Sequence, residues 1–147
     1  MIKDVIVSML IAKEIEFNQD EKYHNIFEVL NRVYVPTLPA VVITDVLVKI
    51  LVPIDKVDEL TGIEPEIHIF DKDDRLISNF FLPSFENLRT SENLPGIDIQ
   101  TNIRFPVKVE GIYEYRLYFK NIHRCSNYIG VFSSEREIER TMKGGEQ

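Results

Sequence analysis

Two neighbouring stretches in the second half of the chain show the clearest alternation of apolar and polar residues. In residues 111–119 one face of an extended chain is apolar and the other is charged (Tyr113, Tyr115, Leu117 and Phe119 against Glu114 and Arg116). Residues 97–105 repeat the pattern, with apolar positions at Ile97, Ile99, Ile103 and Phe105. A period of two predicts half-buried antiparallel strands, and we expect residues 106–111 to connect this pair.

Six further segments have the composition or the alternation of strands: residues 2–17, 23–34, 41–52, 66–70, 75–82 and 128–132. Polar or proline-containing stretches separate them, and residues 71–74 join two of them as a hairpin turn. About eight short strands with frequent turn signals predict an all-β fold. We expect a single-domain antiparallel β-sandwich with Greek-key connections, immunoglobulin-like or C2-like, over residues 1–133. Residues 134–147 form a polar C-terminal tail.

The sequence does not decide the structure of three segments. The spacing of residues 23–34 also permits a helix, which would change the fold class to α+β, but their aromatic and β-branched content favours a strand. Residues 54–62 form either one or two helical turns ending before Gly62 or an acidic loop. Residues 83–96 are the longest unpatterned connection, and loops of that length are functional or mobile.

Composition narrows the class of protein. The chain has 147 residues, which suits one domain, and a net charge of -7 with its basic residues scattered among acids. This charge argues against nucleic acids and anionic membranes as partners. The single cysteine, Cys125, cannot form an internal disulfide and favours a reducing compartment. The apolar run of residues 5–12 follows Asp4 and is too short to span a bilayer, so we expect a buried strand in a cytoplasmic protein.

Three aspartates, Asp71, Asp73 and Asp74, lie in one turn and raise the question of a calcium site. Calcium requires six to eight oxygen ligands, drawn from several loops, and the glycine and glutamate of an EF-hand loop do not follow. Aspartate is also common in hairpin turns, because its side chain bonds nearby backbone groups. We favour the turn, and the sequence leaves cation binding open.

Other titratable residues give no recognisable site. His24, His68 and His123 are far apart and show no metal-ligand spacing. Cys125 lies two residues after His123, so contact within a strand is conceivable, but a lone cysteine is usually a small buried apolar residue. The acidic residues are interpreted as a solvated face (Asp55, Asp58, Glu59, Glu64 and Glu66). We therefore predict no catalytic, cofactor-binding or metal-binding residue.

The tyrosines of residues 111–119 divide into two groups. Tyr113 and Tyr115 lie on the inner face, where Tyr113, two residues after Gly111, is placed for the corner hydrogen bond that sandwich tyrosines make to nearby backbone. Tyr118 lies on the outer face and is the better candidate for contact with a sugar, a base or a partner.

Several short motifs follow one another as in a known family. A Leu38-Pro39-Ala40 step leads into a valine-rich strand, residues 67–73 have the pattern Ile-x-Ile-x-Asp-x-Asp, and Phe-Pro followed by Gly-x-Tyr-x-Tyr occupies residues 105–115. Over residues 5–132 the chain resembles a family of small, uncharacterised bacterial β-sandwich proteins, a domain of unknown function. The resemblance implies an intracellular β-sandwich and provides no catalytic residue.

These observations favour a non-enzymatic protein-interaction module or accessory protein of unknown process. It would bind another protein, or a second copy of itself, through residues 54–62 and 83–96 or through an edge strand. The alternative is a small-ligand or carbohydrate-binding sandwich with a site at one end. An enzyme of unrecognised type ranks third.

Overall fold

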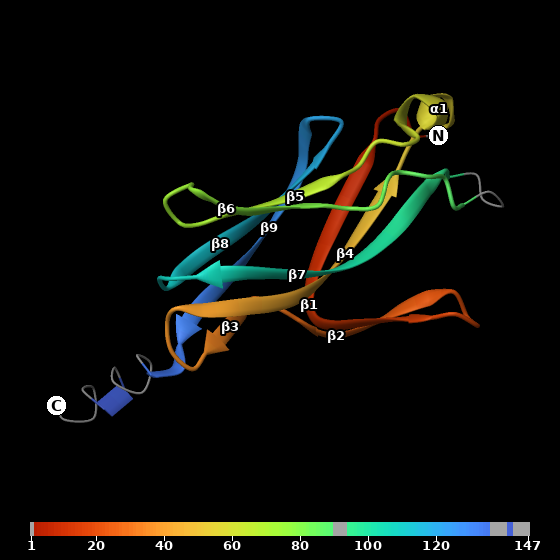
Figure 1. The fold of residues 1–147 in the computed structure, drawn as a ribbon. Helices are drawn as coiled ribbons and strands as arrows, with labels where there is room; N and C mark the ends of the chain where they lie inside the picture. Colours follow the sequence, from red (N-terminus) through yellow and green to blue (C-terminus); the bar gives the residue numbers. More distant parts are fainter. Residues whose placement is uncertain (1, 90–93, 136–140, 143–147) are drawn as a thin grey trace.

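The computed structural model describes residues 2–89, 94–135 and 141–142. Within these residues the chain forms nine strands (Figure 1). They are β1 (Ile6–Asn18), β2 (Tyr23–Val29), β3 (Arg32–Val35), β4 (Ala40–Leu51), β5 (Glu66–Phe70), β6 (Leu76–Phe81), β7 (Gly96–Val107), β8 (Gly111–Phe119) and β9 (Ile122–Ser133). A short 3-10 turn (Ile54–Lys56) and the one-turn helix α1 (Val57–Leu60) separate β4 from β5.

The strands form two sheets. The four-stranded sheet has the order β2-β1-β4-β7, and the five-stranded sheet has the order β3-β9-β8-β5-β6. The all-β class predicted from the alternation is confirmed. The purely antiparallel pairing was wrong in one place, because β3 runs parallel to β9. Parallel pairing between strands so far apart in sequence leaves no local signal in either segment.

The inner faces of the two sheets share one core, as the alternation of residues 97–105 and 111–119 predicts. Tyr115, Leu117 and Phe119 of β8 are inaccessible to solvent. The ring of Phe105 in β7 meets the ring of Tyr115 edge to face, with centroids 5.7 Å apart. The hydroxyls of Tyr115 and Thr44 of β4 are hydrogen bonded at 2.7 Å, so this buried pair of polar groups is satisfied across the two sheets.

The segment predicted as one strand at residues 23–34 is two strands in different sheets. β2 pairs with β1, and β3 pairs with β9 after a break at residues 30–31. The strand interpretation is confirmed against the helical one, but the chain crosses between sheets where the pattern is continuous. This crossing accounts for nine strands in the described residues where the sequence predicts about eight.

The last strand is longer than the sequence predicts. β9 begins at Ile122, directly after Lys120 and Asn121, whose φ angles are 54° and 60°. Two successive residues at positive φ make a tight hairpin turn, for which Asn-Gly or Asp-Gly is the usual sequence signal. The predicted residues 128–132 are therefore only the end of a strand that pairs with β8 along its length.

The two long connections proposed as binding loops pack on each other. Residues 54–60 are helical, and Gly62, at a φ of +89°, follows the end of α1. The backbone of Phe85 is hydrogen bonded to both Gly62 and Ile63, and its buried ring lies 5.7 Å from that of Phe119. Leu60 is buried in the same core. These connections therefore close one end of the core.

The predicted C-terminal tail, residues 134–147, falls largely outside the described residues, and β9 ends at Ser133. Among the described residues, no helix has the length and apolar character needed to cross a membrane.

Candidate functional site

The most exposed apolar element of the described chain is the hairpin of β1 and β2, which we call the ribbon (residues 13–29). β1 pairs with β4 only over Ile6–Ala12 and then with β2 over Ala12–Asn18. At the change of partner the alternation of buried and exposed residues is interrupted, since the neighbours Ile11 and Ala12 are both buried. Beyond Ala12 the ribbon diverges from β4, and β2 is joined to the four-stranded sheet only through β1 (Figure 1).

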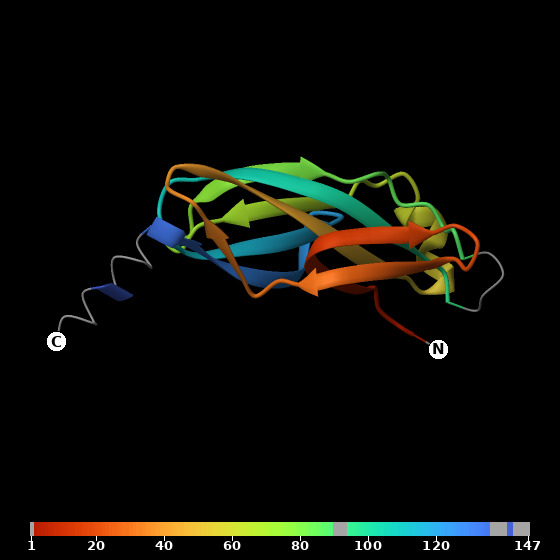
Figure 2. The ribbon, with the colours of Figure 1, turned by 90° about the horizontal axis from the view of Figure 1, so that it is seen from below.

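The ribbon is fastened to the outer face of the four-stranded sheet at Ile15. The backbone N–H of Ile15 donates to the Asp45 carboxylate at 2.9 Å, and the Gln100 side-chain amide donates to the Ile15 carbonyl. Asp45 in turn accepts a 2.8 Å hydrogen bond from the Asn102 side chain. Ile15 is buried although it lies outside the main core. In Figure 2 the ribbon accordingly lies in front of β4 and β7.

β2 is an edge strand whose outer side pairs with no other described strand. Every residue of β2 except His24 is exposed. The exposed fractions of its apolar residues are 47% for Tyr23, 40% for Ile26, 45% for Phe27 and 58% for Val29. An unpaired strand edge bearing large apolar side chains is a template for pairing with another chain.

The fastening of Ile15 indicates which backbone groups of β2 point outward. The N–H of Ile15 is bonded to Asp45 and its C=O to Gln100, so neither group is bonded to Ile26, the residue opposite Ile15 in β2. Ile15 and Ile26 are therefore a pair without backbone hydrogen bonds between them. In an antiparallel ladder the bonded pairs alternate. The N–H and C=O groups of His24 and Ile26 therefore point to the open edge, and those of Asn25 and Phe27 point to β1.

A groove of about 630 Å³ separates the tip of the ribbon from β7 and the connection that precedes it. Phe17 and His24 form its ribbon side, with ring centroids 5.0 Å apart. On the opposite side a nitrogen of Arg89 lies 3.1 Å from both carboxylate oxygens of Asp98. His24, one of the three histidines considered from the sequence, thus lies in the groove beneath the β2 edge.

The other two histidines come together on the outer face of the five-stranded sheet. Tyr118 stands between them, with its ring centroid 4.5 Å from that of His68 and 5.3 Å from that of His123. Next to them Arg116 covers the ring of Phe70 at 3.7 Å. Tyr118 lies on the outer face as predicted, but neighbouring side chains occupy both sides of its ring. This row is a weak platform for stacking a sugar, which needs an open aromatic face.

His123, Ser126 and Glu114 form a hydrogen-bonded chain whose order differs from that of a serine nucleophile site. The Ser126 hydroxyl donates to Glu114 at 2.7 Å, and the His123 Nε2 lies 2.7 Å from the same hydroxyl. In a nucleophile site the serine proton points to the histidine and the carboxylate orients the histidine. Burial works against ionisation of Glu114, but hydrogen bonds from Ser126 and Arg116 outweigh it and lower the pKa of Glu114. A carboxylate with a lowered pKa is a weaker base.

The Cys125 thiol and the His123 ring lie on different faces of the five-stranded sheet, although His123 Nε2 is 3.1 Å from the Cys125 carbonyl oxygen. The β8–β9 register shifts between Leu117 and Tyr118, so that Leu117 faces Cys125 while Tyr118 faces His123. Cys125 packs against the core, where burial raises the pKa of its thiol, and His123 lies on the outer face. A raised pKa leaves less thiolate at neutral pH and so less nucleophile.

The aspartates of residues 71–74 form hydrogen bonds and an ion pair at the hairpin turn. The Asp71 carboxylate accepts the backbone N–H groups of Asp73 and Arg75 at 2.9 and 3.0 Å. Asp74 forms an ion pair with Arg116. In the part of the chain that the structure describes, no group of three or more histidine, cysteine or acidic side chains is arranged to hold a metal ion.

Lys120 forms an ion pair with Glu59, one of the acidic residues interpreted as a solvated face, and this pairing lowers the pKa of Glu59.

No protein-family model, curated protein or solved structure matches this chain. The resemblance drawn from its motifs therefore remains a prediction.

Proposed function

We propose that this chain is a non-enzymatic protein-interaction module that adds an extended segment of a partner protein to the open edge of β2. The observation that carries the proposal is β2, the strand of the ribbon that forms the sheet edge, with seven residues and exposed apolar side chains. Strand addition supplies affinity through backbone hydrogen bonds and specificity through alternate side chains. The connections at residues 54–62 and 83–96 are less suited to this role, because Leu60 and Phe85 are buried in the core.

The charge of the ribbon defines the partner further. Glu14 and Glu16 of β1 stand opposite Phe27 and Asn25 of β2, so the solvent face of the ribbon is both acidic and aromatic. A segment that carries lysine or arginine next to β-branched or aromatic residues complements that face. The expected partner sequence is basic and apolar. The process in which it takes part, and a cytoplasmic location, stay predictions from the sequence.

A peptide-display selection against the purified protein tests this function. We expect enrichment of extended, basic peptides that bind the wild type and Ile26→Thr, which keeps the outward N–H, with similar affinity. Ile26→Pro removes that N–H without touching the ladder to β1 and should weaken binding by about tenfold or more, the scale of losing one or two backbone hydrogen bonds.

A matched control is Ile43→Pro, because Ile43 is an exposed apolar residue of β4 away from the β2 edge. Enriched peptides that bind Ile26→Pro as tightly as the wild type would contradict strand addition at β2. A dimer in light scattering that Ile26→Pro dissociates would show that the occupant of the edge is a second copy of this chain.

A further inference from the structure

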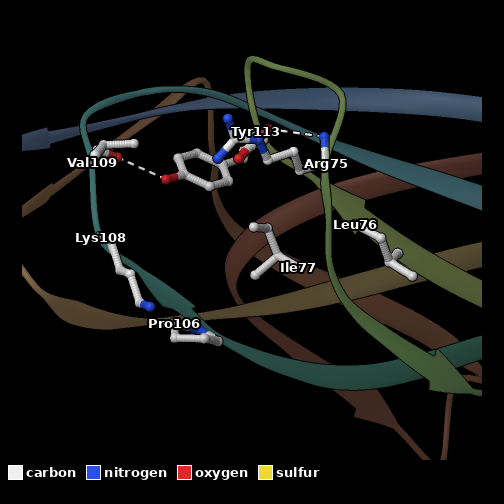
Figure 3. A pocket seen from close by; sticks show the side chains of 8 residues that line it. Arg75, Leu76, Ile77, Pro106, Lys108, Val109 and Tyr113 are labelled. Atoms are coloured by element: carbon white, nitrogen blue, oxygen red, sulfur yellow. Dashed lines mark hydrogen bonds between the residues drawn. The ribbon is translucent and has the colours of Figure 1, made fainter.

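A separate pocket of about 400 Å³ lies at the end of the molecule opposite the tip of the ribbon, where the β5–β6 hairpin meets the β7–β8 connection (Figures 1 and 3). Its apolar part includes Leu76 and Ile77 from β6 and Pro106 from β7. Ile77 also packs against the core. Concave, mainly apolar pockets of this size with a few polar groups are the usual form of small-molecule sites.

Two cations, Arg75 and Lys108, line this pocket. Arg75 precedes β6 and Lys108 follows β7, and Figure 3 shows Arg75 beside Tyr113 and Lys108 beside Pro106. Among the described residues, neither side chain makes a hydrogen bond or an ion pair. Elsewhere in this acidic protein, Arg89 and Arg116 are paired with carboxylates.

The polar groups beside these cations are already engaged. One carboxylate oxygen of Asp71 accepts two backbone N–H groups of the hairpin turn. The Tyr113 hydroxyl donates to the Val109 carbonyl at 2.7 Å, so its proton is committed to the backbone. The pocket therefore offers an apolar surface with two cations against one carboxylate.

We propose that this pocket binds a small organic anion, a carboxylate attached to an aliphatic body. The aliphatic part lies against Ile77, Leu76 and Pro106, and the carboxylate is held by the guanidinium of Arg75 or the ammonium of Lys108. Arginine pairs with carboxylates through two parallel hydrogen bonds, which fixes the orientation of the ligand. A carbohydrate is a poorer match, because Tyr113, the one aromatic residue among the described residues of the lining, is buried.

Isothermal titration of the full chain with octanoate and with its neutral analogue octanamide tests the site. We expect octanoate to bind at least about tenfold more tightly than octanamide, because only the anion engages the cations. Arg75→Gln or Lys108→Gln should remove that preference. Lys49→Gln, which changes an exposed lysine of β4 outside the pocket, should leave the preference unchanged.

Equal binding of octanoate and octanamide would overturn the proposal, and so would a preference for octanoate that survives in both Arg75→Gln and Lys108→Gln. Absence of octanoate binding would overturn it as well. The proposal is independent of strand addition at β2, since the ribbon contributes no residue to this pocket. The Ile26→Pro variant should therefore bind octanoate like the wild type.

Discussion

The carboxylate of Glu114 is the point where three side chains meet on the outer face of β8 and β9. The Ser126 hydroxyl donates to it at 2.7 Å, the Arg116 side chain lies 2.9 Å away, and the Tyr128 hydroxyl donates at 3.4 Å. These contacts favour the ionised form and hold the pKa of Glu114 below its ordinary value against the opposing effect of burial. A carboxyl group whose pKa is lower in the folded than in the unfolded state stabilises the fold at pH values above the pKa that the group has in the unfolded state.

Replacing Glu114 with glutamine should therefore destabilise the protein at neutral pH and have less effect in acid. We expect Glu114→Gln to lower the free energy of unfolding by about 1 kcal/mol at pH 7, a typical value for hydrogen bonds to a charged group with partial exposure. As the pH falls below the ordinary carboxyl pKa and through the lowered folded value, the wild type loses this contribution. Urea unfolding at several pH values measures the difference, and a constant difference between the two proteins would contradict the assignment.

Residue-level inference from the sequence succeeded where the cause is local. The alternation around Tyr115 predicted its burial, and the position of Tyr113 after Gly111 predicted a corner hydrogen bond, which its hydroxyl makes to Val109. For Cys125 the sequence favoured a small buried apolar role over contact with His123, and Cys125 packs against the core. A shift in strand register places Cys125 opposite Leu117 and His123 opposite Tyr118. Such a shift depends on the partner strand and is invisible in one segment.

Among the elements, the ribbon depends on two side chains of its own sheet. Asp45 and Gln100 hold the backbone of Ile15 on the outer face, and Ile15 is the buried residue of the ribbon beyond the point where β1 leaves β4. The joint variant Asp45→Ala with Gln100→Ala should detach the ribbon without opening the core. Amide exchange of Ile15 should then accelerate by about tenfold or more while that of Tyr115 stays unchanged, as local opening predicts.

Lys49→Ala, on the outer face of the same sheet, is the control and should change neither amide. Unchanged exchange of Ile15 in the joint variant would mean that packing of its side chain, rather than these hydrogen bonds, holds the ribbon.

Element-level inference was accurate for isolated alternating segments and inaccurate where a strand changes partners. Residues 41–52 read as one strand with Val46, Val48 and Ile50 on one face, and these residues are buried in β4. Residues 23–34 also read as one strand, but they cross from one sheet to the other. The exposed position of Phe27 could not be predicted, because apolar residues in a strand ordinarily indicate a buried face.

For the whole molecule, the candidate sites lie at opposite ends of one β structure. The open edge of β2 suits a basic, extended segment of another protein, and the pocket beside Arg75 and Lys108 suits an organic anion. The sequence predicted binding through an edge strand without indicating which strand, and it gave no sign of the pocket. The first depends on where the ribbon lies relative to the sheets, and the second joins residues from separate hairpins.

Residue-resolved amide hydrogen exchange of the free protein tests the open edge of β2 most directly. The account predicts alternation along the strand: the amides of His24 and Ile26, which point outward, exchange rapidly, and those of Asn25 and Phe27, which bond β1, exchange slowly. An enriched peptide should then slow the two fast amides. Equal protection of all four amides in the free protein would mean that the edge is already covered, and rapid exchange of all four would mean that the ribbon does not form.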